Sequence, residues 1–122
     1  GSANSSGNYI SIADGAQNNN GNFASGQGVA DWNADRINLT NWGAQNGYGD
    51  ILIIDIIDPQ STTFPKRIQY QISTYNSSEI QVLNGHAYLN TNSGTASTGI
   101  TIKSSGSNTY PTTSLYALYG IK

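Results

Sequence analysis

Acidic side chains recur at short intervals, and they are the first candidates for catalysis. The nearest pairs in the sequence are Asp31 with Asp35, Asp55 with Asp58, and Asp50 with Asp55. A glycan hydrolase needs two carboxyl groups flanking the scissile bond, but acids beside turns and strand ends are ordinarily solvated or capping residues. The single histidine, His86, has no serine or cysteine partner motif. We therefore predict no catalytic residue and no enzyme activity for this domain.

The segment from Asp31 to Asp35 places side-chain oxygens at its first, third and fifth positions, as a calcium loop does. The sixth position holds Arg36 where an EF-hand requires glycine, and the twelfth holds Trp42 where it requires glutamate. The segment is therefore not an EF-hand. A turn held by Asx hydrogen bonds is the favoured interpretation, with a calcium site of another kind as the alternative. We predict no metal and no cofactor.

Several aromatic residues stand beside amide, carboxylate or guanidinium side chains. The C–H face of a sugar packs on an aromatic ring, and neighbouring polar groups replace water at the ring edge. Arg36 and Arg67 could each bind a carboxylated sugar or pair with an aspartate. For each loop aromatic, packing over the end of the fold is the alternative, whereas Tyr70 and Tyr119 follow strand alternation and are expected in the core. The predicted ligand-binding residues are Trp32, Asn33, Asp35, Arg36, Tyr48, Tyr75, Asn76, His86 and Tyr110.

The composition excludes several classes of partner. Charged residues make up 10% of the 122 residues, the formal net charge is −2, and there is no cysteine. This balance offers no footprint for nucleic acid or an anionic membrane surface. The longest apolar run, Ile51 to Ile57, is interrupted by Asp55 and is too short to span a bilayer. Polar, uncharged surfaces of this kind bind through hydrogen bonds.

Short alternating segments separated by Gly, Asn and Ser predict about eight strands and no helix. The expected fold is an all-β antiparallel sandwich, jelly-roll-like, with residues 1–8 as a protease scar and linker and 9–122 as a single domain. Residues 14–28 are expected to form a long loop, Asn84-Gly85 a hairpin turn, and Ile80 and Val82 to point inward. The predicted strands cover residues 9–12, 36–40, 50–58, 67–75, 79–83, 86–90, 100–102 and 115–121.

Two of these strands are apolar on both faces. Alternation puts Ile51 and Ile53 on one face of the segment 51–57, and Leu52, Ile54 and Ile56 on the other. A two-layer sandwich buries only one face of each sheet, so we expect another subunit to cover the second. Cover by the 14–28 loop is the alternative. A buried Asp55 would have to be paired, hydrogen-bonded or protonated, with Arg36, Lys66 and Arg67 as the candidate partners; a bulge that turns it to solvent is the alternative. The predicted oligomer interface is Ile51, Ile53, Ile54, Ile56, Tyr116, Leu118 and Ile121.

The chain ends on Ser114-Leu115-Tyr116-Ala117-Leu118-Tyr119-Gly120-Ile121-Lys122. This ending, together with a charge-poor, cysteine-free composition rich in Asn, Ser, Gly and Tyr, resembles the carboxyl-terminal domains of bacteriophage tail fibres and tailspikes. The resemblance implies a homotrimeric jelly roll in the virion tail, outside the cell, that recognises a host surface polysaccharide. A trimerisation domain without a ligand of its own is the alternative. The parent chain upstream could still be a glycan depolymerase.

Overall fold

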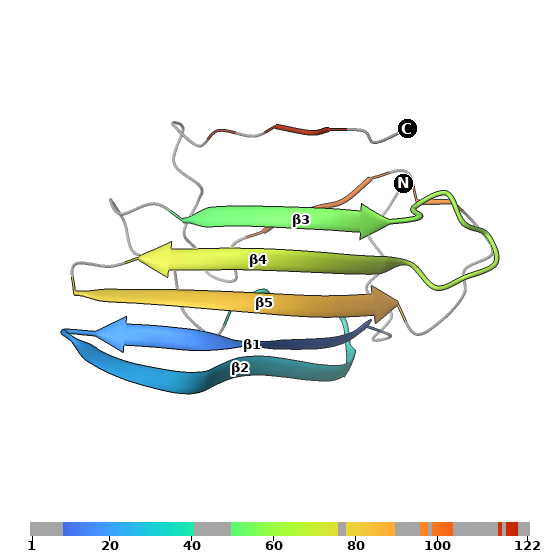
Figure 1. Ribbon diagram of the computed structural model, residues 1–122. Helices are drawn as coiled ribbons and strands as arrows, with labels where there is room; N and C mark the ends of the chain where they lie inside the picture. Colours follow the sequence, from blue (N-terminus) through green and yellow to red (C-terminus); the bar gives the residue numbers. More distant parts are fainter. Residues whose placement is uncertain are drawn as a thin grey trace.

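In the computed structural model, residues 9–40, 50–75, 78–89, 96–97, 99–103, 115 and 117–119 are described. They contain five strands: β1 (Tyr9–Asn19), β2 (Asn22–Ala34), β3 (Ile51–Ile57), β4 (Arg67–Tyr75) and β5 (Glu79–Leu89). All five form one antiparallel sheet in the order β2-β1-β5-β4-β3 (Figure 1). The all-β, antiparallel prediction is confirmed. Within the described ranges there is no helix, and hence none that could cross a membrane.

The long loop predicted for residues 14–28 is wrong, because this segment forms most of a β-hairpin. β1 and β2 pair from Tyr9 opposite Ala34 to Asn19 opposite Asn22. The two turn residues, Asn20 and Gly21, have φ angles of 49° and 84°. An Asn-Gly pair with positive φ at both positions matches the twist of a two-residue hairpin. The turn signal was present in the sequence, but the flanking Gly, Asn and Gln residues carry no apolar alternation.

Asn84 and Gly85, the predicted turn, lie instead in the middle of β5. Gly85 faces Tyr70 on β4 and Ala13 on β1 in the ladder. A Cβ atom at position 85 would collide with the Tyr70 ring. The glycine therefore leaves the space that the aromatic side chain occupies. β5 therefore runs unbroken from Glu79 to Leu89, where two separate strands were predicted.

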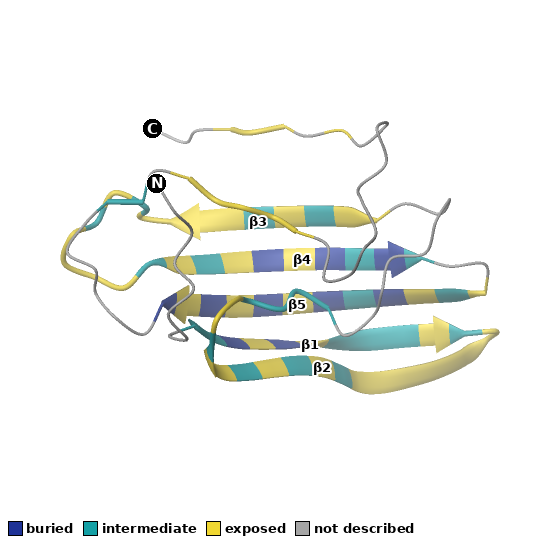
Figure 2. Cartoon of the chain, turned by 180° about the vertical axis from the view of Figure 1, so that it is seen from behind, coloured by how far each residue is buried: buried dark blue, intermediate teal, exposed yellow. Residues whose placement is uncertain are grey.

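The core lies on one side of the sheet, which we call the back face. It is built around Ala13, Tyr70, Ile72 and Leu83, with Leu83 completely buried. The strand predicted at 67–75 and the core position predicted for Tyr70 are confirmed, since Ile68, Tyr70 and Ile72 point to the back and the intervening glutamines do not. Figure 2 shows buried residues concentrated on β4 and β5, the central strands. The other side of the sheet we call the open face.

Residues 35–40 cross the back face, because β2 and β3 lie at opposite edges of the sheet. Ile37 and Leu39 pack against the core, and the Thr40 hydroxyl donates to Gln81 Oε1 at 3.0 Å. The Tyr70 hydroxyl donates to the Asn38 carbonyl at 3.4 Å. Burial raises the pKa of Tyr70 to about 12, and the nearby Asp31 carboxylate adds to the shift. The strand predicted at 36–40 is thus an irregular crossing segment that covers the core.

Three predictions for the segments after residue 78 are also wrong. Ile80 and Val82 point to the open face, while the buried side chains of that segment are Gln81 and Leu83. Residues 100–102 form no strand. The described part of the last predicted strand is also not a strand, and its side chains are almost fully exposed: Leu115, Leu118 and Tyr119 at 97%, 92% and 85%. Tyr119 is therefore not a core residue.

Candidate binding face

The open face is a solvent-exposed sheet surface ordered in rows across the strands. Side chains that are opposite one another in an antiparallel ladder lie on the same face, about 5 Å apart. Two neighbouring central rows are polar. One row runs Asp14, Asn84, Gln71, Ile53, and the other runs Ile12, His86, Gln69, Asp55. We call the polar members of these rows, Asp14, Asn84, Gln71, His86, Gln69 and Asp55, the polar belt.

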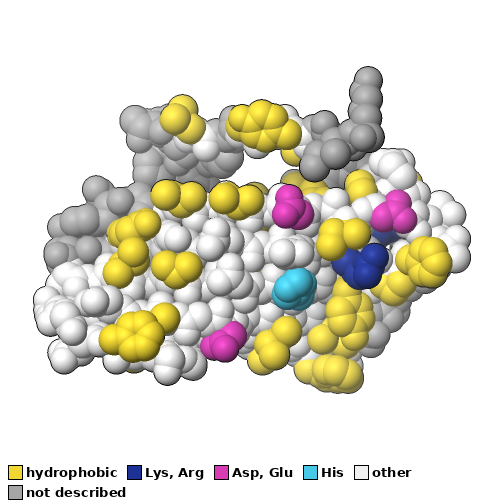
Figure 3. Space-filling view, in the orientation of Figure 1, with side chains coloured by type: hydrophobic (Ala, Val, Ile, Leu, Met, Phe, Trp, Pro, Cys, Tyr) yellow, Lys and Arg dark blue, Asp and Glu magenta, His cyan; other side chains and the backbone are white. Residues whose placement is uncertain are grey.

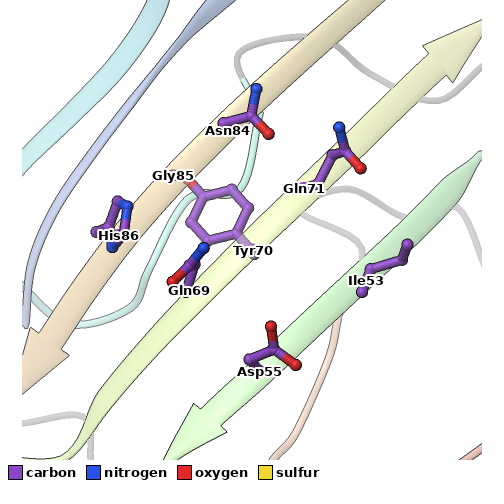
Figure 4. Close-up of a pocket in the computed structure, with 8 residues that line it drawn as sticks. All are labelled: Ile53, Asp55, Gln69, Tyr70, Gln71, Asn84, Gly85 and His86. Carbon is purple, nitrogen blue, oxygen red and sulfur yellow. The ribbon is translucent and has the colours of Figure 1, made fainter.

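Every member of the polar belt is exposed. Figure 3 shows the single histidine, in cyan, open to solvent in the middle of this face, with white surface on one side of it and yellow hydrophobic side chains on the other. A shallow depression of about 220 Å³ is lined by Asn84 and His86 from β5, Gln69 and Gln71 from β4, and Ile53 and Asp55 from β3. Figure 4 shows these side chains standing on the three adjacent strands, with the Tyr70 ring over Gly85. The belt therefore offers amide, carboxylate and imidazole groups side by side.

Apolar residues border the belt at both ends of the strands. On one side the next row is Ile10, Tyr88, Arg67, Ile57, with Trp32 beyond it on β2. A second depression, of about 190 Å³, lies there and shares His86 with the first. On the other side the next row is Ala16, Val82, Ser73, Ile51. Yellow patches on both sides of the belt in Figure 3 correspond to this arrangement.

Asp55 needs neither of the solutions expected for it. β3 pairs with β4 in continuous register from Ile51 to Ile57, so no bulge is present. Its carboxylate points to the open face and is exposed. In the described part of the chain the only ion pair joins Arg36 to Asp35, so Asp55 has no basic partner there. The otherwise apolar strand β3 can therefore carry an acid, because its open face is exposed to solvent.

The predicted ligand-binding residues are dispersed. His86 lies in the polar belt, and Trp32 is exposed at 73% on β2. Asn33 occupies a bulge in β2 with φ of 52°. Tyr75 is half-buried at the end of β4, and its backbone N–H donates to Asp50 Oδ1 at 3.4 Å. Tyr48, Asn76 and Tyr110 lie outside the described residues.

Asp35 and Arg36 are engaged with each other. Two hydrogen bonds of 2.8 and 2.9 Å join the guanidinium to the two carboxylate oxygens. These bonds lower the pKa of Asp35 and raise that of Arg36. Of the two arginines considered for a carboxylated sugar, Arg36 is thus already paired, whereas Arg67 stands on the open face. The other belt residues were not predicted as ligand-binding residues, because what identifies them is their exposure on a shared face of the sheet. The sequence does, however, show Gln69 and Gln71 on the polar side of β4.

The acids singled out for chemistry lie on different strands, with Asp31 on β2 and Asp55 on β3. Asp31 accepts hydrogen bonds from the Ser11 hydroxyl at 3.1 Å and from the backbone and side chain of Asn38 at 3.1–3.2 Å. It therefore fastens the crossing segment to β1 and β2. The predicted Asx turn is wrong, because Asp31 to Ala34 belong to β2 and the bonds to Asp31 come from residues 7 and 20 positions away. Among the described residues, no three His, Cys, Asp or Glu side chains gather in a way that could hold a metal ion.

The predicted interface residues divide between the two faces. Ile51 and Ile53 are exposed on the open face at 59% and 56%. Ile54 packs against the core on the back face, and Ile56 is 37% exposed there. Leu118 is exposed, and Tyr116 and Ile121 lie outside the described residues. The hairpin of β1 and β2 forms the edge of the sheet opposite β3, so it does not cover β3 as the alternative required.

Comparison of the chain with protein-family models, with curated proteins and with solved structures finds no match. The functional interpretation therefore depends on the geometry of the open face itself.

Proposed function

We propose that this domain is a carbohydrate-binding module that holds a polysaccharide against the open face. The observation that carries the proposal is the polar belt, six exposed hydrogen-bonding side chains in two adjacent rows, bordered by apolar rows. Sugars present hydroxyl groups at the ring edge and C–H groups on the ring face, so they need both kinds of surface together. The central rows carry two acids and one histidine, and Arg67 stands in the bordering row, so the open face has no strong field of a single sign.

The shape of the face favours a polymer over a small enclosed ligand. The two depressions measure about 220 and 190 Å³ and lie side by side on an open sheet. Pockets that enclose small molecules are typically about 300–1,000 Å³ and bury most of the ligand. A chain of sugars that lies across several strands would instead gain its affinity from repeated modest contacts. Binding without catalysis is part of this proposal, because the two acids of the belt, Asp14 on β1 and Asp55 on β3, are separated by β5 and β4.

The biological setting we propose is the carboxyl-terminal domain of a phage tail fibre or tailspike, in the virion tail, with a host surface polysaccharide as the ligand. The charge-poor composition and the Leu-Tyr-Gly-Ile-Lys motif of residues 118–122 support this setting. A jelly-roll-like sandwich, in which a second layer covers the back face, would complete the fold. The crossing segment with Ile37 and Leu39 supports that part of the proposal, since it already occupies the core side of the sheet.

A second candidate function is assembly, with the domain acting as a clamp between copies of the chain in a homotrimer. The exposure of Ile51 and Ile53, and of Leu115, Leu118 and Tyr119, favours it. Apolar side chains exposed to this degree are stabilised by association. Sedimentation of the domain, with and without residues 115–122, tests this function separately from ligand binding.

The binding proposal is tested by glycan-array screening followed by NMR titration of the ¹⁵N-labelled protein. Chemical-shift changes should concentrate on β3, β4 and β5 residues of the polar belt. The double variant Gln71→Ala/Asn84→Ala should weaken binding about tenfold or more, because each lost hydrogen bond corresponds to about 1 kcal/mol. Asn22→Ala, an exposed amide beside the hairpin turn, is the matched control and should bind normally. Shift changes confined to other parts of the chain, or an absence of any glycan ligand, would contradict the proposal.

A further inference from the structure

The two depressions on the open face differ in chemistry although they touch at one residue. Both include His86. The first is lined by the amides and carboxylate of the polar belt. The second is lined on the open face by Ile10, Ile12, Ile57, Arg67 and Tyr88 around the same histidine. We call it the apolar depression. The centres of the two depressions are offset by one row of side chains, and adjacent rows on one face are about 7 Å apart along β5.

The apolar depression combines an exposed hydrocarbon floor with a cationic donor. Ile12 is 63% exposed, although it lies on an inner strand of the sheet. Arg67 stands between Tyr88 and Ile57 in the ladder. Its guanidinium has no ion-pair partner among the residues that the structure describes, where Arg36 alone is paired. A group that fills this depression would therefore gain from a small apolar part and from a hydrogen-bond acceptor beside it.

We propose that the apolar depression recognises the acetamido group of a 2-acetamido sugar, whose neighbour in the chain lies on the polar belt. This inference rests on the proposed function and specifies its ligand class. The acetamido methyl would contact Ile12 and Tyr88, and the acetamido carbonyl oxygen would accept from Arg67 or His86. A deoxy-sugar methyl supplies no acceptor for Arg67. A carboxylate supplies no apolar part, and it would stand near Asp55, one row away from Arg67 on the adjacent strand.

Matched trisaccharides test the inference directly. Triacetylchitotriose and cellotriose share a β-1,4-linked glucan backbone and differ at the 2-acetamido groups, while the glucosamine trimer replaces acetamido with ammonium. Burial of one methyl corresponds to about a fourfold change in Kd, and the added hydrogen bond to a further factor of about three. We therefore expect triacetylchitotriose to bind about tenfold more tightly than cellotriose in an NMR or calorimetric titration, and more tightly than the glucosamine trimer.

Two variants assign that preference to the apolar depression. Ile12→Asn should reduce the preference for the acetylated trimer about fourfold, and Arg67→Met, which keeps an unbranched apolar stem, should reduce it about threefold. Ile100→Asn is the matched control, since Ile100 is 48% exposed and lies on no strand of the sheet; it should leave the preference unchanged. Far-ultraviolet circular dichroism of each variant checks that the sheet is retained.

The outcomes separate this inference from the proposed function. Equal binding of triacetylchitotriose and cellotriose, with both weakened by Gln71→Ala, would overturn the acetamido assignment and leave carbohydrate binding in place. Equal or tighter binding of the glucosamine trimer would also overturn it, because attraction to Asp14 and Asp55 would then explain the affinity. If neither neutral trisaccharide binds, the acetamido assignment is overturned, and the glycan array decides the proposed function on its own.

Discussion

Replacing Gly85 with alanine is expected to destabilise the fold, although glycine is ordinarily a poor residue in the middle of a strand. The added Cβ would collide with the ring of Tyr70. β5 cannot move aside, because it is hydrogen-bonded to β1 and β4 along its length. The ring must therefore rotate out of a site where only 3% of the residue is exposed.

The net cost is estimated from three contributions. Overpacking of a core site costs about 1–3 kcal/mol. Displacement of the ring also sacrifices the bond from the Tyr70 hydroxyl to the Asn38 carbonyl, worth about 0.5–1.5 kcal/mol. Alanine recovers about 0.5–1 kcal/mol through its better strand propensity. The free energy of unfolding should therefore fall by about 2 kcal/mol.

Urea denaturation followed by circular dichroism measures this change. With an m-value of about 2 kcal/mol/M for a domain of this size, the midpoint should fall by about 1 M. Asn84→Ala, at the adjacent exposed position of β5, is the control and should change the stability by less than about 0.5 kcal/mol. In a Tyr70→Leu background the Gly85→Ala substitution should cost much less, because the clash is gone. An unchanged or raised midpoint for Gly85→Ala in the natural background would refute the assigned role of the glycine.

Three further predictions concern single contacts. Because the pKa of Tyr70 is raised from 10 to about 12 in the folded state, the contribution of the protonated Tyr70 to stability is complete below pH 10 and is lost as the pH rises toward 12. Urea midpoints should therefore decline between pH 10 and pH 12, and Tyr70→Phe should make that decline smaller. Gly21→Ala should cost about 1–2 kcal/mol by forcing alanine to φ of 84°, whereas Gly99→Ala, with open space around its Cβ and no positive φ, should cost little; equal thermal shifts would contradict the hairpin assignment. Asp31→Ala removes the acceptor that ties the crossing segment to β1 and should lower the free energy of unfolding by about 2 kcal/mol. Asp55→Ala should change it by less than about 0.5 kcal/mol. Comparable losses for the two variants would refute the structural role assigned to Asp31.

The open face could be anticipated from the sequence only in part. Alternation in β4 placed Gln69 and Gln71 on the side opposite Tyr70, which is correct. No local pattern, however, aligned these glutamines with Asn84 on β5 or Asp55 on β3. That alignment depends on the register between strands, which is set by pairing along whole ladders and not by any one segment.

The amino-acid pattern alone determined that the chain is built of antiparallel strands, because period-two alternation and Gly/Asn turn signals act over a few residues. It also determined that β3 would be apolar on both sides and that Tyr70 would be buried. Which side of each strand faces the core was decided only in the tertiary structure. Gln81 and Leu83, and not Ile80 and Val82, face the core, because the crossing segment hydrogen-bonds to Gln81 on the back face. Likewise, Asn84-Gly85 became strand rather than turn because the Tyr70 ring needs the space above a glycine, a contact between residues fifteen positions apart that no local signal records.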